Sequence, residues 1–315
     1  MPVIGVVEPG FFTTVQDLGR GQCAHLGLAA SGAADTLSLR LGNMLAGNPE
    51  STAGLEMTLT GGTFAFEDMA LIALAGSDFG SSLDEQPVPN WAPFEVKPGQ
   101  TLRCGATRAG ARCYLCVNGG IDVPPVLGSA STHARIGIGG LGGRALRAGD
   151  TLHTGPPASP SLTLSHVHPQ RVLRWLDSSV IRVTPGPQSH WFTSEAGERF
   201  WRDPYAVSDA ADRMGLRLNG KKLDFHRRGE MITEGISLGA VQVPPDGQPI
   251  LLLCEHQTTG RYPKIANVIS ADLPRAGQLK PHDRVRFQLV FFEEAATALR
   301  EMEDWITSLV HVHQH

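Results

Sequence analysis

The chain has 315 residues, of which 41% are hydrophobic and 18% are charged, and its formal net charge is −4 at pH 7. This length exceeds the usual size of one hydrophobic core, so two domains are expected. The slightly acidic balance offers no basic surface for nucleic acid or for an anionic membrane, and no apolar run is long enough to cross a bilayer. Five irregularly spaced cysteines do not indicate a disulfide framework. The first residues lack the pattern of a secretory signal, so a cytoplasmic location is expected.

The first predicted element is a helix over residues 35–45, with Asp35 at its N-terminus. Its apolar residues follow helical spacing: Leu37, Leu41, Met44 and Leu45. Two strands are predicted next. Residues 62–66 alternate small and aromatic side chains, and residues 71–75 form a short apolar run typical of a strand buried on both faces.

A Pro-Gly turn at residues 97–100 separates two further predicted strands, 94–96 and 101–104. Proline fixes φ and glycine permits a positive φ, so this pair suits a tight turn. Related turns, each followed by Leu or Val, recur at residues 147–152 and 280–285. The three turns predict antiparallel β structure with closely spaced hairpins.

Residues 113–117 predict a buried strand whose two cysteines face opposite sides, as structural thiols do, rather than sharing a metal or a redox role. Residues 156–170, rich in Pro, Ser and His, form the predicted linker, and a helix is predicted over residues 293–309. No metal site is predicted, because the histidines of the linker and of the chain end are expected to be solvated: His166, His168, His311, His313 and His315. The chain is therefore predicted to be mainly β, with two barrel-like halves and a terminal helix.

Residues 31–43 and 208–220 repeat one motif, Ser-x-Ala-Ala-Asp followed by Leu-Arg-Leu, at an offset of 177 residues. Other matches follow in the same order; Glu56, for example, corresponds to Glu234 at an offset of 178. A long repeat in register predicts two related domains rather than a solenoid.

The shared Leu-Arg-Leu residues are predicted to build the scaffold of each half, whereas positions that differ are predicted to carry function. Thr36 corresponds to Arg213, and Asp78 corresponds to His256. Because reactive residue types concentrate in the second copy, we expect the second half to bear more of the chemistry.

Residues 258–264 combine two hydroxyls, a guanidinium, a phenol and an ammonium ahead of an apolar run. A lysine at the start of a buried strand, here Lys264, could bind a carboxylate or a carboxyl phosphate as a point charge. A surface loop with a lysine extended to solvent fits the same residue types equally well. Near the N-terminus, His25 follows the polar segment 13–20, for which a capped loop on the first domain is the plain structural interpretation.

Six segments in order along the chain match the motifs of one family: residues 9–20, 31–35, 119–129, 208–215, 242–249 and 257–265. The last of them reads Gln-Thr-Thr-Gly-x-Tyr-Pro-Lys-Ile. Through these motifs the chain resembles the biotin-dependent carboxyltransferase family, subdomain A/B. This family includes the large subunit of bacterial ATP-dependent 5-oxoprolinase, the allophanate hydrolase subunit 2 proteins, the carboxyltransferase region of urea carboxylase, and an antagonist of a sporulation-kinase inhibitor.

The resemblance implies a mainly β chain with few helices and a C-terminal helix. It implies two related cyclophilin-like β-barrel domains. We place the first domain at residues 1–165 and the second, which includes the C-terminal helix, at residues 171–315. It implies a companion subunit that carries carboxyltransferase subdomains C and D and, in the 5-oxoprolinase case, a third subunit of another fold. No tightly bound cofactor is expected. ATP would be used by the complex, and biotin would arrive only on a partner chain, because a Met-Lys-Met biotinylation site is missing.

The function expected from the resemblance is that of a subunit of an ATP-dependent 5-oxoprolinase complex, a hydrolase that converts 5-oxoproline to glutamate. Two alternatives stay open. One is a carboxyltransferase subunit of a biotin-dependent urea carboxylase or allophanate hydrolase-type system. The other is a regulatory protein that binds and antagonises a histidine-kinase inhibitor.

The resemblance and the residue types together suggest the site. Lys264 is expected to contact an anion, Tyr262 to donate a hydrogen bond, and Asp17 and Asp212 to act as acid/base or orienting groups. Candidate substrate-binding residues are Arg20, His25, Ser31, Arg213, Gln257, Thr258 and Thr259.

The chain departs from the family pattern in three places. Ala130 stands where the family often has arginine, Arg261 stands where glycine is common, and His256 stands in place of part of an Asp-Arg pair before Gln257. One arginine is lost and another gained, so contacts to an anion are expected to differ from the family pattern.

Overall fold

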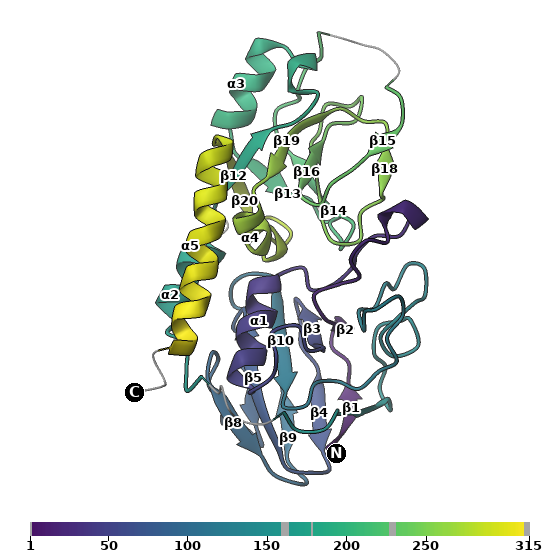
Figure 1. The fold of residues 1–315 in the computed structure, drawn as a ribbon, viewed down its shortest axis with the longest axis vertical. Helices are drawn as coiled ribbons and strands as arrows, with labels where there is room; N and C mark the ends of the chain where they lie inside the picture. Colours follow the sequence, from purple (N-terminus) through teal and green to yellow (C-terminus); the bar gives the residue numbers. More distant parts are fainter. Residues whose placement is uncertain (1, 159–163, 178, 227–230, 312–315) are drawn as a thin grey trace. The chain divides into compact units, whose positions relative to one another are not determined.

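A computed structural model describes residues 2–158, 164–177, 179–226 and 231–311 of the chain. The chain divides into two compact units, which are described separately (Figure 1). The first comprises Met1–Gly21, Ser31–Leu173 and Ile306–His315, and the second comprises Gln22–Ala30 and Arg174–Trp305.

The first unit contains two antiparallel sheets that enclose one hydrophobic core. The strand order of one sheet is β11-β1-β4-β9-β6-β7, and that of the other is β2-β3-β10-β5-β8. The first sheet consists of β1 (Val3–Glu8), β4 (Thr63–Phe66), β6 (Ser82–Leu83), β7 (Gln86–Pro87), β9 (Thr101–Arg103) and β11 (Thr151–His153). The second consists of β2 (Phe12–Gln16), β3 (Gly54–Thr58), β5 (Ala70–Gly76), β8 (Pro93–Val96) and β10 (Arg112–Val117). Alternate apolar residues of both sheets meet in the core, for example Ile4 and Phe64 from one sheet and Leu55 and Leu115 from the other.

Helix α1 (Thr36–Leu45) packs against β5 and β10, so these strands are covered on both faces. All six residues of β10 are consequently buried, as the apolar run predicts. All five cysteines are buried thiols, and burial raises the pKa of Cys104 to about 11 and that of Cys116 further still. These results confirm the predicted helix and the predicted strands at residues 62–66, 71–75 and 113–117.

The Pro-Gly turn forms where it was predicted, but it does not make a hairpin. Gln100 N donates to Lys97 O at 3.1 Å, and Gly99 has a φ of 85°. The flanking strands nevertheless belong to different sheets, since β8 pairs with β5 whereas β9 pairs with β4 and β6. The prediction of a hairpin here is wrong, because turn residues fix a local reversal of the chain but not the partner of each strand.

The second unit contains a closed barrel with the strand order β12-β19-β16-β17-β14-β13-β20. These strands are β12 (Val180–Pro185), β13 (Tyr205–Val207), β14 (Gly215–Asn219), β16 (Ala240–Gln242), β17 (Ile250–Leu252), β19 (Lys264–Val268) and β20 (Arg284–Leu289). The parallel pairing of β12 with β20 closes the barrel, which leaves no open edge. A separate two-stranded sheet joins β15 (Glu234–Gly235) to β18 (Thr259–Gly260).

Aromatic packing fills one end of the barrel core. The rings of Phe200 and Phe287 stack with centroids 4.6 Å apart, and Tyr205 lies 5.8 Å from Phe200. Phe200 comes from a helix, and Phe287 comes from β20, so this contact fixes the helix against the barrel wall.

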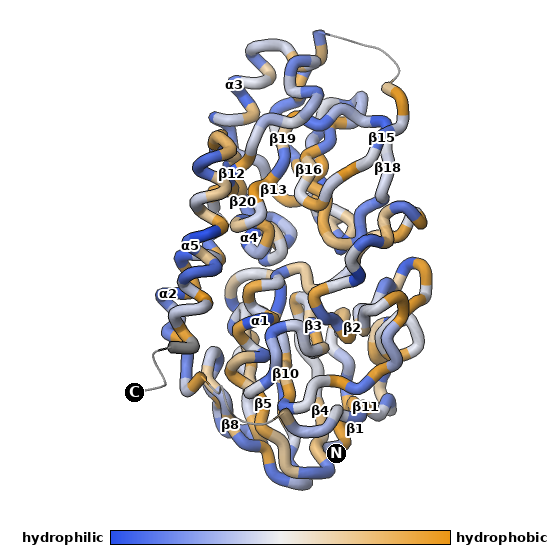
Figure 2. Tube along the Cα trace, viewed as in Figure 1, coloured by the Kyte–Doolittle hydropathy of each residue, from blue (hydrophilic) through white to orange (hydrophobic). Residues whose placement is uncertain are grey.

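The helices and 3-10 turns outside the first unit's core are α2 (Pro169–Leu176), α3 (Ser194–Arg202), α4 (Leu273–Gly277), α5 (Phe292–His311), η1 (Ala24–Leu26), η2 (Ser189–Trp191) and η3 (Ser270–Asp272). Helix α5 confirms the predicted C-terminal helix, and the tube along it alternates between hydrophilic and hydrophobic residues (Figure 2). Helix α2 begins inside the predicted linker, and α3 was not predicted. Thr193 caps α3, since its Oγ1 accepts from Ala196 N at 3.1 Å.

The fold class is confirmed: the chain is mainly β, with a barrel in its second half and a helix at its C-terminal end. Among the helices that the structure describes, none combines the length and the apolar character needed to span a membrane. His166 and His168 are exposed, whereas His313 and His315 lie outside the described residues. The described part of the chain contains no group of histidine, cysteine and acidic residues that could hold a metal ion.

The two copies of the repeated motif form different elements. In the first copy, Asp35 caps helix α1, and in the second, Asp212 lies in a turn that leads into strand β14. The leucines of both copies are buried, at Leu39 and Leu41 in the helix and at Leu216 and Leu218 in the strand. The motif therefore supplies core residues to both halves, as predicted, but not equivalent secondary structure.

Candidate functional site

Lys264 is the first residue of barrel strand β19, and its side chain is almost completely buried. Its Nζ donates to Glu234 Oε1. A buried ammonium needs such a partner, because transfer of an unpaired charge out of water is very costly. The first interpretation of the sequence, a lysine that contacts an anion, agrees with this placement better than a lysine extended to solvent.

Gln188 connects both members of this ion pair. Its Nε2 donates to Glu234 Oε1 at 2.8 Å, and its Oε1 accepts from the backbone N of Lys264 at 3.2 Å. Its own backbone N donates to Lys264 O at 3.2 Å. Gln188 thus fixes the start of β19 and orients the Glu234 carboxylate. The pKa of Glu234 is lowered, mainly by the hydrogen bond from Lys264; burial opposes this effect, and the hydrogen bond from Gln188 adds a smaller lowering.

Gln242 lies opposite Lys264 in the pairing of β16 with β19. The register shifts between Val241 and Gln242, so that Ile265 is passed over and Gln242 is aligned with Lys264. Gln242 is 1% exposed, and its Oε1 accepts from Gln257 Nε2 at 3.3 Å. Its Nε2 is buried without a hydrogen-bond partner among the described residues.

Gly260 covers this amide. A Cβ at Gly260 would lie 3.1 Å from Gln242 Nε2 and 3.7 Å from Gln257 Nε2. Gly260 also pairs with Glu234 between β18 and β15. We call the set Gln188, Glu234, Gln242, Gln257 and Lys264 the Lys264 cluster. It combines an ammonium, a carboxylate and three carboxamides in one place within the second unit.

The loop before β19 carries the other predicted residues of this segment. Tyr262 is 39% exposed, and Thr259 is exposed in β18. Thr258 contributes its backbone carbonyl, which accepts from Ile236 N at 2.9 Å. Of the residues predicted from this segment, Gln257 bonds to Gln242 and Lys264 bonds to Glu234, and the strand pairing aligns Gln242 with Lys264.

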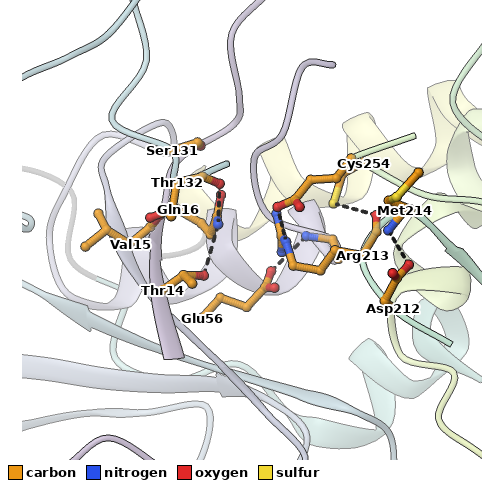
Figure 3. A network of polar contacts seen from close by, with 12 residues as sticks. Thr14, Val15, Gln16, Glu56, Ser131, Thr132, Asp212, Arg213, Met214 and Cys254 are labelled. Atoms are coloured by element: carbon orange, nitrogen blue, oxygen red, sulfur yellow. Dashed lines mark hydrogen bonds and ion pairs between the residues drawn. The ribbon is translucent and has the colours of Figure 1, made fainter. Parts of the chain in front are cut away.

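Arg213 lies in a buried ion pair in the second unit, with its Nε 2.6 Å from Glu255 Oε1. The neighbouring Asp212 is exposed, and its Oδ1 accepts from Met214 N at 2.8 Å and from Gly215 N at 3.1 Å (Figure 3). Cys254 Sγ contacts Arg213 O at 3.9 Å. The structure therefore uses Arg213 to bind a carboxylate of the chain itself, and Asp212 to close a turn.

In the first unit, Asp17 organises the loop at residues 129–131. Its carboxylate accepts from Ser129 Oγ at 2.7 Å, from Ala130 N at 2.7 Å and from Ser131 Oγ at 2.5 Å. It also accepts from Gly19 N at 2.7 Å. Through these four hydrogen bonds the carboxylate orients the loop, which corresponds to the orienting alternative of its predicted role.

Arg20 and Ser31 lie against the same loops. Arg20 is 1% exposed, and its Nη2 donates to Ser131 O. Ser31 is buried with a φ of 54°, and its Oγ has no hydrogen-bond partner among the described residues. Beside them, Gln16 Nε2 donates to Thr14 Oγ1 at 3.0 Å and to Thr132 O at 3.1 Å (Figure 3). By contrast, His25 is exposed in the short turn η1.

Sequence reasoning missed three members of the Lys264 cluster. Gln242 stands at the head of a family motif and Glu234 is the repeat counterpart of Glu56, so two of them had a signal that was not used. Gln188 had none, because it reaches Lys264 across 76 residues of sequence, through two hydrogen bonds to the Lys264 backbone.

Comparison with known proteins identifies a common family. The family model of the carboxyltransferase domain, subdomain A and B, matches residues 26–289. A 5-oxoprolinase subunit from Escherichia coli is 38% identical, over 98% of this chain and 97% of that protein. The corresponding 5-oxoprolinase subunit from Haemophilus influenzae is 37% identical, with the same coverage of both chains.

A solved structure of the same architecture comes from a larger enzyme. The structure of Kluyveromyces lactis urea carboxylase superimposes on 98% of this chain with a TM-score of 0.91 and 31% sequence identity. This chain corresponds to only 29% of that protein. The fold described above is therefore found both in chains of this size and as one part of a long multidomain chain.

Proposed function

This chain belongs to the family of carboxyltransferase domains, subdomain A and B, and from this membership we propose that it is a subunit of an ATP-dependent 5-oxoprolinase complex. The observation that carries the proposal is the 38% identity to the Escherichia coli 5-oxoprolinase subunit over 98% of this chain. The complex would be a hydrolase that opens the cyclic amide of 5-oxoproline to give glutamate.

The Lys264 cluster supports this assignment through its chemistry. 5-Oxoproline carries a carboxylate and a cyclic amide, and its ATP-dependent opening passes through an anionic, phosphorylated species. Lys264 provides a positive charge in a low-dielectric setting, where it acts more strongly on an anion than in water. The carboxamides of Gln242 and Gln257 can each donate to a carbonyl oxygen and accept from an amide N–H.

The remaining predicted residues receive supporting roles in the proposal. Tyr262 is exposed beside the start of β19 and would donate its phenolic hydrogen to the substrate. Arg213 is paired with Glu255, so we propose that it orients the loop between β17 and β18. Asp17 and Asp212 would act as orienting groups through the hydrogen bonds that they accept.

The proposal includes partner chains, as the designation of the relatives as subunits suggests. We propose a companion subunit with carboxyltransferase subdomains C and D, and a third subunit of another fold. ATP would be handled within that complex rather than held tightly by this chain.

The test is the steady-state 5-oxoprolinase activity of the reconstituted complex. Lys264→Ala is expected to lower kcat/KM by about 100-fold or more, as loss of one preorganised donor to a developing charge does in other enzymes. Lys264→Arg, which keeps the charge, should retain more activity than Lys264→Ala. Lys221→Ala removes an exposed lysine and is the matched control. Full activity of a folded Lys264→Ala complex would show that the lysine has no such role.

A second candidate function is that of a carboxyltransferase subunit of a urea carboxylase-type system, which the TM-score of 0.91 to urea carboxylase favours. Biotin would have to be carried by another chain, since Lys221 and Lys222 occur in Asn-Gly-Lys-Lys and not in a biotinylation motif. Urea-dependent consumption of carboxybiotin by the complex, without hydrolysis of 5-oxoproline, would select this function over the first.

A further inference from the structure

The two side chains of the ion pair in the Lys264 cluster differ in their exposure to solvent. The side chain of Lys264 is 4% exposed, whereas that of its partner Glu234 is 43% exposed. Glu234 belongs to a two-residue strand outside the barrel, and Lys264 belongs to a barrel strand. The buried cation is therefore fixed, and its counter-ion is a half-exposed side chain on a minor element. Water competes for the half-exposed Glu234 carboxylate, so another anion can replace it as long as the buried ammonium keeps a counter-ion.

The residue opposite Lys264 in the strand pair carries a donor that has no partner among the described residues. Gln242 Nε2 is buried and has no acceptor among the described residues, although burial of an unsatisfied donor is normally avoided. Gln242 faces Lys264 across the strand pair, where side chains of opposed residues lie about 5 Å apart. Gly260 lies against this nitrogen: a Cβ there would come within 3.1 Å of it and within 2.6 Å of Ile236 Cδ1, so only a glycine fits at this position.

These pairings bring one carboxylate and two donors onto neighbouring residues of the second unit. Glu234 pairs with Gly260, Gly260 lies against Gln242, and Gln242 faces Lys264. The Glu234 carboxylate satisfies Lys264 but leaves the Gln242 amide without an acceptor. A free carboxylate has two oxygens and could accept from both donors at once.

We propose that Lys264 Nζ and Gln242 Nε2 bind the carboxylate of a small organic acid, and that Glu234 is an internal substitute which this ligand displaces. The identification of the acid as 5-oxoproline rests on the proposed function. The carboxylate site itself does not.

This arrangement determines the direction of two mutational effects. Removal of the internal competitor in Glu234→Gln strengthens binding of the acid, by up to about five-fold, because the ligand no longer has to displace a half-exposed carboxylate from Lys264. Replacement of the donor in Gln242→Glu puts a second carboxylate opposite the ligand and should abolish binding. If Glu234 were instead a ligand-binding or purely structural residue, its loss would weaken binding or leave it unchanged.

The experiment is calorimetric titration of the full-length chain with 5-oxoproline, with its carboxamide counterpart, which lacks the carboxylate, and with acetate. The wild-type chain and Glu234→Gln, Gln242→Glu and Gln242→Leu are compared, and Glu198→Gln is the control for loss of an exposed carboxylate. We expect tighter binding of 5-oxoproline to Glu234→Gln, loss of binding in both Gln242 variants, and no binding of the carboxamide. Thermal unfolding of each variant establishes that it is folded.

Equal or weaker binding to Glu234→Gln overturns the proposal, and so does unchanged binding to Gln242→Leu or tight binding of the carboxamide. The proposed function is tested separately by the activity of the complex. If the carboxylates bind in the expected pattern but the complex does not hydrolyse 5-oxoproline, the carboxylate site stands and the proposed function fails. If the complex hydrolyses 5-oxoproline but the Glu234 and Gln242 variants bind 5-oxoproline as the wild-type chain does, the proposed function stands and the carboxylate site fails.

Discussion

The segments 31–41 and 208–218 share a motif, yet the first is mostly buried and leads into a helix, whereas the second begins with partly or fully exposed residues and leads into a strand. In the first, Ala34 N donates to Glu56 and Asp35 N donates to Tyr114, both from strands distant in sequence. In the second, Ser208 N and Asp212 N bond within the motif itself, to Arg217 O and Gly215 O. One motif is therefore satisfied by tertiary partners and the other by a local turn.

The residues after the shared Leu-Arg-Leu account for this difference. The first copy continues as Gly-Asn-Met-Leu, whose apolar residues extend the helical stripe. The second continues as Asn219-Gly220, a turn pair that stops the chain from continuing as a helix. The alternation of Leu216, Arg217 and Leu218 then suits a strand with one buried face. Similar motifs do not force similar structure when their flanking residues differ.

Glu56 and Glu234 provide the largest expected contrast between the two halves. Glu56 is fully buried, and it accepts from Tyr114 Oη at 2.7 Å beside Arg112. Glu56→Ala should lower the free energy of unfolding by about 3–5 kcal/mol, because it breaks a buried pair from one side. Glu234→Ala should cost less, about 1–3 kcal/mol, because its own carboxylate is half exposed, although the buried Lys264 loses its counter-ion. Urea unfolding of both variants is the measurement, and equal costs would contradict the contrast.

Asp35 and Asp212 are expected to differ by a smaller amount. The buried Asp35 carboxylate accepts from Ser38 N at 2.9 Å and from Ser38 Oγ at 2.5 Å, so it caps α1. Asp35→Ala should cost about 2 kcal/mol, and Asp212→Ala should cost about 0.5 kcal/mol, because the exposed Asp212 turn can bond to water instead. Chemical denaturation, analysed with a common m-value, measures both losses of unfolding free energy. A larger loss in Asp212→Ala than in Asp35→Ala would show that hydrogen bonds to distant strands are not the more stabilising ones.

The smallest expected effect concerns His256, the repeat counterpart of the exposed Asp78. Burial lowers the pKa of His256 below its usual 6.5, against a smaller opposing effect of its contact with Gln257 O. The folded state therefore favours the neutral imidazole, and the unfolded state takes up the proton first as the pH falls. This contribution to stability is present above about pH 6.5 and is lost as the pH falls toward the lower, folded-state pKa.

Thermal unfolding between pH 7.5 and 5.5 measures this contribution. The wild-type chain should lose more stability over that range than His256→Asn, which has no imidazole to protonate. The same pH dependence in both proteins would show that His256 does not contribute to the loss of stability at low pH.

The sequence predicted those parts of the fold that depend on nearby residues. The stripe of Leu37, Leu41 and Met44 located helix α1, and the apolar run of residues 71–75 located strand β5. Strand partners could not be predicted in the same way. The Pro98-Gly99 turn joins two sheets rather than two paired strands, and the turn residues contain no information about which neighbour each strand selects.

The candidate site was predictable to a similar extent. Lys264 stood out because several reactive side chains precede it at the start of an apolar run, and the structure places it in a polar cluster. Glu234 and Gln188 reach it from 30 and 76 residues away, through contacts that depend on the closed barrel. Gln242 could not be aligned with Lys264 from spacing, because the alignment depends on a register shift within the strand pair.

That register shift makes the cluster depend on the number of backbone residues as much as on their side chains. A regular ladder would have set Gln242 against Ile265, a residue of the barrel core, and the extra position sets it against Lys264 instead. Deletion of one residue at the register shift would keep every side chain of the cluster in the sequence. It would nevertheless exchange the inward-facing and outward-facing residues of the strand. A redesign or transplant of this barrel must therefore preserve the phase of β19 before any single side chain is optimised.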